Sequence, residues 1–292
     1  MAHRLLLDTS SLMYRAFFAL PPSIKDDDGR PVNAVHGYLD MTTRLIQTRQ
    51  PDSVIHCYDD VYIPAERAEA YPPYKAHRPP DPEGLPEQFD LLESVLAAFG
   101  AERASAPAWE ADDAIGTLCA QAGPDDEIEI VTGDRDLLQL VRDHSPIVRV
   151  LFTVKGVSEL GAFDEAAVMA KYGVPAARYV DFATLRGDPS DGLPGVAGIG
   201  EKTALKLVTT YPTLDALVAA ADDLPARQAA NLRASAVYLQ AMRLVVPVRT
   251  DVEVSIQRGE LHREQLDVLA EARHLGGPIR RLSEALAGQL AG

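Results

Sequence analysis

Acidic side chains crowd into a few short stretches of this sequence, and the densest stretch is Glu110-Ala111-Asp112-Asp113. Three carboxylates within four residues at a predicted helix start repel one another, and the helix dipole offsets only about 0.3 to 1 kcal/mol per group. Taken alone, this stretch is better explained as a solvated helix start. It gains interest because further carboxylates follow predicted strands or lie in loops: Asp8, Asp60, Asp134, Asp136, Asp188 and Asp191.

A cluster of carboxylates without histidine or cysteine suits hard divalent cations. Mg²⁺ and Mn²⁺ favour oxygen ligands, and Mg²⁺ usually keeps several of its waters. Two such ions about 4 Å apart can activate an attacking water and stabilise the leaving oxygen of a phosphodiester. If the fold brings these carboxylates together, phosphodiester hydrolysis is the reaction that they predict.

The elements that would position these carboxylates follow an alternating pattern. Apolar residues predict buried strands at 4–7, 53–58 and 127–131. Aspartate follows the first two strands at once, and the third ends in Thr132-Gly133-Asp134-Arg135-Asp136. Helical patterns are found at 34–48, 86–99 and 109–122. This alternation is typical of a parallel sheet with helical crossovers, in which ligands gather at the carboxyl ends of the strands. We therefore expect the carboxylates to meet at that edge.

Residues 63–85 interrupt the alternation, because they are rich in proline, tyrosine and basic residues and have little apolar periodicity. Within them, the run Tyr71-Pro72-Pro73-Tyr74-Lys75-Ala76-His77-Arg78 interleaves cations with aromatic rings. Such a mixture suits single-stranded nucleic acid, through phosphate contacts and base stacking. The alternative is a surface loop with incidental charges. If the segment became helical, Lys75 and Arg78 would share a face.

Glycine and proline recur from 186 to 212, before and around a predicted helix at 201–210, and suggest a change of domain. Further helices are predicted from 214 and over 226–245. In the run from Gly195 to Ala204, glycines before a helix would let a phosphate approach backbone N–H groups. An ordinary tight connection between helices explains this run equally well on its own.

Composition limits the class of protein. The formal net charge of -15 argues against a polyanionic partner, but 186–249 contains seven Lys and Arg against six Asp and Glu. Bound cations would neutralise part of the remaining acid. Cys57 and Cys119 lie in apolar runs and are expected to be buried, reduced thiols. Because no apolar run is long enough for a signal peptide or membrane span, we expect a cytoplasmic protein.

Four motifs together resemble the bacterial 5′ nuclease family, the flap endonuclease group that includes the N-terminal domain of DNA polymerase I. They are Tyr74–Arg78, Trp109–Asp113, Thr132–Leu140 and Gly187–Ala204, in order along about 4–250. The resemblance implies a stand-alone α/β protein. Its PIN-like domain, a mostly parallel sheet flanked by helices, would span 1–175 with a helical arch at about 63–90. A helix-three-turn-helix domain would span 176–262, and a helical segment 263–292.

The resemblance also implies roles for individual residues. The metal cluster would comprise Asp8, Asp60, Glu110, Asp112, Asp113, Asp134, Asp136, Asp188 and Asp191. Lys75 and Arg78 of the arch, together with Arg15, would engage the scissile phosphate and stabilise developing charge. DNA would be contacted by Tyr74, Gly195, Gly198, Gly200, Lys202 and Thr203. A potassium ion commonly accompanies the helix-three-turn-helix.

The implied activity is metal-dependent 5′-3′ exonuclease and flap endonuclease cleavage in DNA replication and repair, by a monomer. Expected substrates are 5′ flaps and nicked or 5′-ended duplexes, with RNA–DNA hybrids as further candidates. A branched-DNA-binding protein without catalysis, and a phosphatase for small esters, remain alternatives.

The sequence departs from the family pattern at Thr9 and Gly192, where glycine and asparagine are usual. It also carries Asp59-Asp60 where one aspartate is usual. Counting back from Arg67 favours Asp60 as the ligand, with Asp59 as the alternative.

Overall fold

The computed structural model describes residues 2–290 and centres on one seven-stranded sheet with the strand order β6-β5-β4-β1-β2-β3-β7. Pairs β1–β2, β1–β4, β2–β3 and β4–β5 are parallel. The outermost strands are antiparallel to their neighbours, β6 to β5 and β7 to β3. The strands are β1 His3–Asp8, β2 Ser53–Tyr58, β3 Glu102–Ser105, β4 Glu127–Thr132, β5 Ile147–Thr153, β6 Leu160–Phe163 and β7 Ser255–Gln257. The mostly parallel α/β sheet predicted from the sequence is confirmed.

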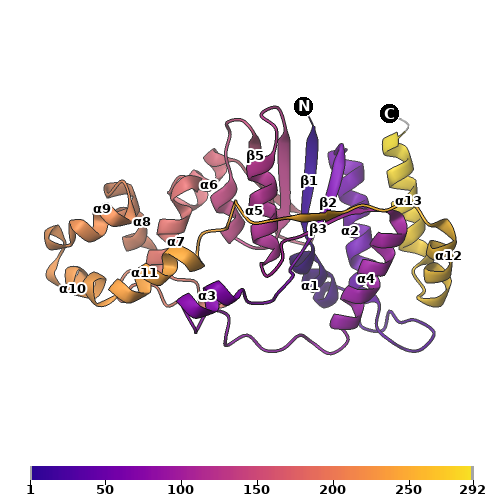
Figure 1. Ribbon diagram of the computed structural model, residues 1–292, viewed down its shortest axis with the longest axis horizontal. Helices are drawn as coiled ribbons and strands as arrows, with labels where there is room; N and C mark the ends of the chain where they lie inside the picture. The colour runs from indigo at the N-terminus through magenta and orange to yellow at the C-terminus, as the bar shows by residue number, and fades with distance from the viewer. Residues whose placement is uncertain (1, 291–292) are drawn as a thin grey trace.

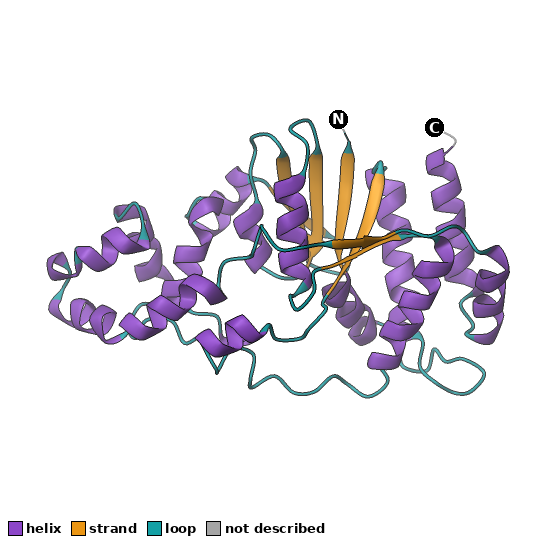
Figure 2. Ribbon diagram, in the orientation of Figure 1, coloured by secondary structure: helices purple, strands orange, loops and turns teal. Residues whose placement is uncertain are grey.

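Helices cover both faces of this sheet (Figure 2). The alternation of side chains along β1 explains the two layers, because Leu5 and Leu7 face one way and Leu6 the other. Leu5 and Leu7 share a core with helices α1 (Thr9–Ala19), α2 (Asn33–Arg49) and α4 (Pro86–Phe99). Leu6 packs into the core that includes Ile115 of α5 (Ala111–Gln121).

A helical region follows at one end of the molecule (Figure 1). Helices α6 (Glu165–Tyr172) and α7 (Tyr179–Arg186) lead into it, and its members are α8 Glu201–Thr210, α9 Leu214–Ala219, α10 Ala226–Ala234 and α11 Ala236–Val245. The single helix predicted over 226–245 is therefore wrong in detail. Its chain tightens at Ser235, whose N–H is shared between the carbonyls of Asn231 and Leu232. The hydroxyl of Tyr238 ties this region to α7 by donating to the carbonyl of Thr184 at 3.0 Å.

The chain then returns to the sheet. β7 pairs with β3, and helices α12 (Arg263–Ala272) and α13 (Gly276–Leu290) complete the fold. Arg281 of α13 bonds Asp40 of α2 at 2.7 Å, and Arg273 bonds the buried Asp26 at 2.6 Å. No helix within residues 2–290 is both long and apolar enough to cross a bilayer.

The segment expected to form a helical arch is only partly helical. Helix α3 covers Ala65–Ala70, and residues 71–85 form turns and extended chain before α4 begins. Lys75 adopts a φ of 52°, which lies outside helical geometry. Lys75 and Arg78 therefore do not share a helix face, because Pro72, Pro73 and Pro79 disfavour a continuous helix here.

Candidate active site

The acidic residues meet at the carboxyl edge of the parallel strands, where Figure 1 shows α1 and α3. A cavity of about 800 Å³ opens at this edge. Its carboxylates come from loops after three strands and from two further segments, the start of α5 and the short 3₁₀ turn Pro189–Asp191. Apart from Asp81, which comes from residues 71–85, they are Asp8, Asp59, Asp60, Glu110, Asp112, Asp134, Asp136, Asp188 and Asp191.

Backbone and hydroxyl groups fix the carboxylates that follow β1 and β4. Asp8 caps α1 by accepting the N–H of Ser11 at 3.0 Å, and its other oxygen accepts the hydroxyl of Thr132 at 2.6 Å. The same hydroxyl oxygen accepts the N–H of Asp134 at 2.8 Å. Asp134 in turn accepts the N–H of Asp136 at 2.8 Å. Thr132 therefore links the two strand ends and sets the spacing of their carboxylates.

Buried like charges raise the pKa values of several cavity carboxylates. Burial, followed by the charges of Asp59 and Asp134, raises the pKa of Asp8 to about 7. Burial, followed by the charge of Asp134, raises the pKa values of Asp112 and Asp136 well above the usual range. The charge of Asp134 thus acts on two groups of carboxylates, one with Asp8 and Asp112 and the other with Asp136, Asp188 and Asp191.

Glu110 differs from these aspartates because cations of the chain surround it. Burial alone would raise its pKa, but Lys75 and Arg67 outweigh burial and lower it. Both cations form ion pairs with its carboxylate, and Tyr74 donates its hydroxyl at 3.0 Å. Tyr74 was expected to stack on DNA, but it is only 4% exposed. That expectation is corrected, since the ring packs in the core and the hydroxyl is occupied by Glu110.

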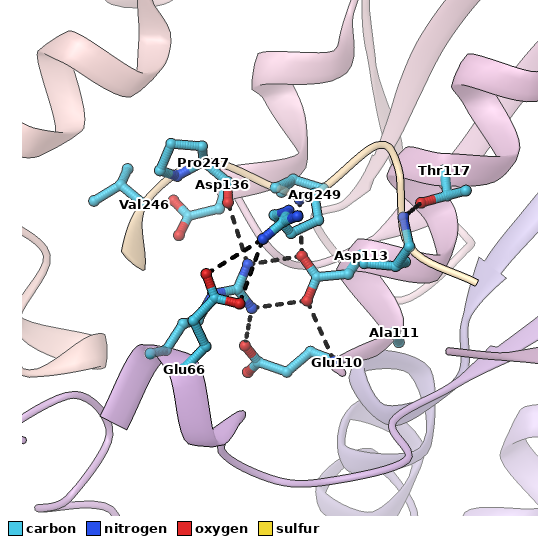
Figure 3. Close-up of polar contacts among 12 residues, drawn as sticks. Glu66, Glu110, Ala111, Asp113, Thr117, Asp136, Val246, Pro247 and Arg249 are labelled. Atoms are coloured by element: carbon cyan, nitrogen blue, oxygen red, sulfur yellow. Dashed lines mark hydrogen bonds and ion pairs between the residues drawn. The ribbon is translucent and has the colours of Figure 1, made fainter. Parts of the chain in front are cut away.

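Asp113 is absent from the cavity lining, although Asp112 beside it is present. It is fully buried on another face of α5, where Arg67 binds both of its oxygens at 2.8 and 2.7 Å. One of these oxygens also accepts the N–H of Arg249 at 2.9 Å. Figure 3 shows Asp113 between Glu110 and Arg249. The structure therefore brings Asp113 next to Glu110, through Arg67, but not into the cavity with the other expected ligands.

Both aspartates after β2 border the cavity, but their carboxylates have different neighbours. Asp59 accepts the N–H of Ala111 at 2.7 Å and the hydroxyl of Ser10, and its charge acts on Asp8. Asp60 accepts the N–H of Ala108 at 2.6 Å. The structure thus brings Asp59, the alternative left open by the sequence, into the group around Asp8.

The three expected phosphate-binding cations do not all reach the cavity. Lys75 and Arg78 line it, and Arg78 bonds Asp191 at 2.5 Å while the N–H of Lys75 bonds the carbonyl of Asp191 at 2.9 Å. Arg15 instead lines a neighbouring pocket and donates to the carbonyl of Val154 at 3.4 Å. Lys75 is 9% exposed, so its ion pair with Glu110 must open before the ammonium can meet a ligand.

The glycine run before α8 divides into packed and open positions. The Cβ of an added side chain at Gly195 would lie 2.5 Å from the carbonyl oxygen of Arg186, and the N–H of Gly195 is donated to Tyr238 at 3.2 Å. Gly198 has a φ of 73°, whereas a Cβ at Gly200 would meet open space. Gly200 precedes α8, whose first turn carries the exposed Lys202 and the partly exposed Thr203.

Divalent cations fit the chemistry of this cavity. Its donors are oxygens, and burial together with neighbouring carboxylates raises the pKa of Asp8, an effect that a bound dication would offset. As the side chains lie, however, the described residues include no group of three or more histidine, cysteine or acidic side chains placed to hold one metal ion. Lys75 and Arg78 pair with Glu110 and Asp191 instead.

Comparison with protein families identifies both parts of the chain. Residues 3–173 match the 5′-3′ exonuclease N-terminal resolvase-like domain, and residues 174–268 match the 5′-3′ exonuclease C-terminal SAM fold. The chain belongs to the 5′-3′ exonuclease family. The resemblance seen in the sequence is confirmed, and so is the combination of a PIN-like domain with a helical domain.

Similar relatives include stand-alone exonucleases. A 5′-3′ exonuclease of Streptomyces coelicolor is 46% identical over 97% of this chain and 99% of its own. A 5′-3′ exonuclease of Mycobacterium tuberculosis is 43% identical over 86% and 85%. DNA polymerase I of Mycobacterium tuberculosis is 42% identical over 86% of this chain but only 28% of its own.

Solved structures of the same fold include T5 5′-exonuclease with bound zinc, at a TM-score of 0.65 and 17% identity over 97% of this chain and 99% of that one. The catalytic core of Rad2 in complex with DNA substrate matches at a TM-score of 0.58 and 16% identity over 98% and 92%. These likenesses concern the fold.

Two residues that hold the cavity carboxylates in place were not predicted from the sequence of this exonuclease-family chain. Arg67 served only to count back to Asp60, yet it is 3% exposed and binds both Glu110 and Asp113. No spacing in the sequence could reveal these contacts, because Arg67 is separated from Glu110 by 43 positions and from Asp113 by 46 positions. Thr132 could have been found, because a hydroxyl directly after a buried strand is well placed to orient neighbouring carboxylates.

Proposed function

We propose that this protein hydrolyses phosphodiesters of branched or 5′-ended DNA, as a 5′-3′ exonuclease and flap endonuclease that uses divalent metal ions. The observation that carries the proposal is the convergence of carboxylates from five segments on one cavity that also contains Lys75 and Arg78. The named activity of relatives 46% and 43% identical supports the same reaction.

The residues that would hold the ions fall into the two groups joined by Asp134. The first group is Asp8, Asp59, Glu110 and Asp112, with Asp60 as the alternative to Asp59. The second group is Asp136, Asp188 and Asp191. Asp113 is left out because Arg67 and the N–H of Arg249 occupy its oxygens. Bound Mg²⁺ or Mn²⁺ would supply an activated water and stabilisation of the leaving oxygen. The zinc in T5 5′-exonuclease supports a divalent ion in this fold.

Lys75 and Arg78 would bind the scissile phosphate. Each now pairs with a cavity carboxylate, Glu110 or Asp191. When those carboxylates take up other cations, the two side chains become free to contact phosphate oxygens from the side of residues 71–85. Preorganised cations in a site shielded from water stabilise developing negative charge strongly. Until that exchange the pairing keeps the buried Lys75 charged, because burial alone would lower its pKa but Glu110, Tyr74 and Asp191 outweigh burial and raise it above normal.

The DNA duplex would lie along the helical region, at the first turn of α8. Gly198, Gly200, Lys202 and Thr203 offer an open helix N-terminus and an exposed cation there. We further propose that a potassium ion binds at this turn and that RNA–DNA hybrids are also cleaved. The protein would act as a monomer, in the cytoplasm and in association with the nucleoid. So does the division at about residue 175 into a nuclease domain and a helical domain. The DNA substrate bound to the Rad2 core supports DNA as the partner.

The test compares cleavage of a 5′-labelled flap duplex by wild type, Asp112→Asn and the matched control Asp267→Asn. Asp267 is an exposed aspartate on α12, far along the chain from the cavity residues. We expect junction cleavage in Mg²⁺ or Mn²⁺ by wild type and by Asp267→Asn, and at least a hundredfold slower cleavage by Asp112→Asn.

Circular dichroism and DNA binding must be unchanged in each variant before lost cleavage is attributed to lost chemistry. Retained binding of the flap by wild type, without product under either metal, would instead support a branched-DNA-binding protein without catalysis. Hydrolysis of a nucleoside monophosphate in preference to the flap would support a phosphatase.

A further inference from the structure

A second pocket of about 930 Å³ lies beside the acidic cavity. Both are lined by Ser11, Tyr14 and Phe18 of α1 and by Gly133 after β4, so they are neighbours separated by these side chains. The second pocket continues along α1 and α2 to residues 155–158, in the loop between β5 and β6. Because the acidic cavity extends from Asp188 and Asp191 to α1, the second pocket begins where the cavity ends, away from the helical region.

The charge of this pocket is opposite to that of the cavity. Its cations are Arg15, Arg44 and Lys155, and its one carboxylate, Asp40, already bonds Arg281 at 2.7 Å. Lys155 pairs with Glu159 at 2.9 Å in an exposed setting, where such pairs are weak. Throughout the described part of the chain, neither Arg15 nor Arg44 forms an ion pair. In a protein of net charge -15, two such arginines in one concave site indicate an anionic ligand.

Arg15 is held ready for such a ligand. One guanidinium nitrogen donates to the carbonyl of Val154 at 3.4 Å, and another would lie 3.2 Å from a Cβ added to Gly133. Its Nε is buried and has no hydrogen-bond partner. A buried polar atom without a partner is unusual and costs free energy unless a ligand or water satisfies it. The absence of a side chain at Gly133 keeps the space beside the guanidinium open.

An exposed aromatic ring borders both sites. Phe18 is 72% exposed, and it contacts Phe17 edge to face with 5.3 Å between ring centroids. Tyr14 lies on its other side at 6.5 Å between centroids. Exposed aromatic rings next to cations are the combination that single-stranded nucleic acid uses, with bases stacked on rings and phosphates on the cations.

We propose that this second pocket binds the single-stranded 5′ portion of the DNA strand that leaves the acidic cavity. This inference rests on the proposed function. Arg15 and Arg44 contact phosphates of that strand, and Phe18 stacks on a base at the boundary of the two sites. The volume suits one or two nucleotides, as in small-ligand sites. A duplex, whose major groove alone is about 12 Å wide, would lie across the opening rather than enter it.

The test measures binding and cleavage by the full chain with two substrates, a nicked duplex without a flap and the same duplex with a 5′ flap of several nucleotides. The variants are Arg44→Ala, Arg15→Ala with Arg44→Ala, and Phe18→Ala. The matched control is Arg280→Ala, which removes an exposed arginine of α13 whose partner is Glu284 at 3.9 Å. Binding is measured by fluorescence anisotropy in EDTA over a range of KCl concentrations, so that no strand is cut.

We expect the arginine variants to weaken binding of the flap substrate and leave the nicked duplex unchanged. Each lost phosphate contact should lower the slope of log K against log[KCl] by about 0.7, the value for single strands. Phe18→Ala should weaken flap binding about tenfold without changing that slope. In Mg²⁺, KM for the flap should rise by the same factors in Arg44→Ala and Phe18→Ala, while kcat and cleavage of the nicked duplex stay near wild type in these two variants.

Equal effects on both substrates, or no effect in any variant, would overturn the inference. Displacement of the flap strand by a nucleoside monophosphate at equal concentration would also overturn it, because the pocket would then take free nucleotides. If wild type cuts neither substrate in Mg²⁺ or Mn²⁺, the proposed function fails. The anisotropy measurements still decide whether the pocket binds a 5′ strand in that case.

Discussion

Asp112 and Asp113 are neighbours in the sequence and have the same chemistry, but the fold gives them opposite surroundings. Asp112 faces other carboxylates across the cavity, and burial with that repulsion raises its pKa. Asp113 faces Arg67, which binds both of its oxygens. Two adjacent positions on one helix therefore carry a carboxylate that is repelled by its neighbours and a carboxylate that is paired with a cation. Their effects on the free energy of unfolding should differ.

We expect Asp112→Asn to raise the free energy of unfolding in EDTA at neutral pH, because it removes one of the mutually repelling carboxylates. Asp113→Asn should lower it by about 3 to 5 kcal/mol, since it leaves the buried Arg67 with an incomplete partner. Urea denaturation of both variants gives the comparison. A loss of stability in Asp112→Asn as large as that in Asp113→Asn would contradict the assignment of the two roles.

At the scale of elements, the glycine run before α8 combines a packed turn with an open helix start. Gly195 approaches the backbone of Arg186 and Gly187, and has a φ of 69° that L side chains rarely adopt. Gly200 has open space around the position of a Cβ. The same residue type therefore serves folding at one position and access at the other.

Gly195→Ala should destabilise the protein by about 1 to 3 kcal/mol or more, because its Cβ would overlap backbone atoms. Gly200→Ala should leave the free energy of unfolding nearly unchanged and weaken binding of duplex DNA. Thermal unfolding and anisotropy with a blunt duplex separate the two effects. Unchanged stability in Gly195→Ala would be inconsistent with the close approach in this turn.

Away from the cavity, ionic contacts join β1, α2 and β4. Glu129 is 1% exposed and bonds His3 at 2.9 Å and Arg49 at 2.8 Å. Burial alone would raise the pKa of Glu129, but hydrogen bonds from His3 and Arg49 lower it. The hydrogen bond to Glu129 raises the pKa of His3 above 6.5.

The pKa of Glu129 is lowered and that of His3 is raised, so both groups stabilise the fold only within a window of pH. The contribution of Glu129 is present above its unfolded-state pKa near 4.5 and is lost as the pH falls through its lower folded value. The contribution of His3 is present below 6.5 and is lost as the pH rises through its higher folded value. The free energy of unfolding of Glu129→Gln should therefore differ from wild type most between about pH 4.5 and 6.5. A difference that is constant from pH 3 to 9 would contradict this contact.

Much of this architecture follows from local patterns. The runs at 53–58 and 127–131 are rich in apolar and β-branched residues, so β2 and β4 were predicted within one residue of their bounds, and the helices at 86–99 and 201–210 were predicted at theirs. Strands β3 and β7 could not be predicted, because each is short and depends on pairing with residues far along the chain, β3 with β2 and β7, and β7 with β3. The non-helical path of 71–78 likewise depends on tertiary contacts of Tyr74 and Lys75.

The cavity was partly predictable for the same reason. Aspartates at strand ends must meet in a parallel sheet, so Asp8, Asp134 and Asp136 could be placed together from the sequence. The direction of a side chain at a helix start or in a loop is set by partners far along the chain. The sequence alone could therefore separate neither Asp112 from Asp113 nor Asp59 from Asp60.

At the scale of the whole molecule, we propose that this acidic protein contacts DNA through cations at three places. Lys75 and Arg78 lie at the acidic cavity, Lys202 at the start of α8, and Arg15 with Arg44 in the second pocket. These places succeed one another from the helical region at one end of the molecule toward α1 and α2 (Figure 1). A substrate that extends along this path would contact cations at each of the three places.

The most direct test of the central claim is cleavage of a 5′-labelled flap duplex by the wild-type protein across a titration of Mg²⁺ and of Mn²⁺, with EDTA and a blunt duplex as controls. We predict no product in EDTA, and metal-dependent product at the junction or from the 5′ end, with a dependence on ion concentration steeper than for one ion. Cleavage that persists in EDTA, or binding of the flap without product at every concentration of both ions, would contradict metal-ion catalysis in the acidic cavity.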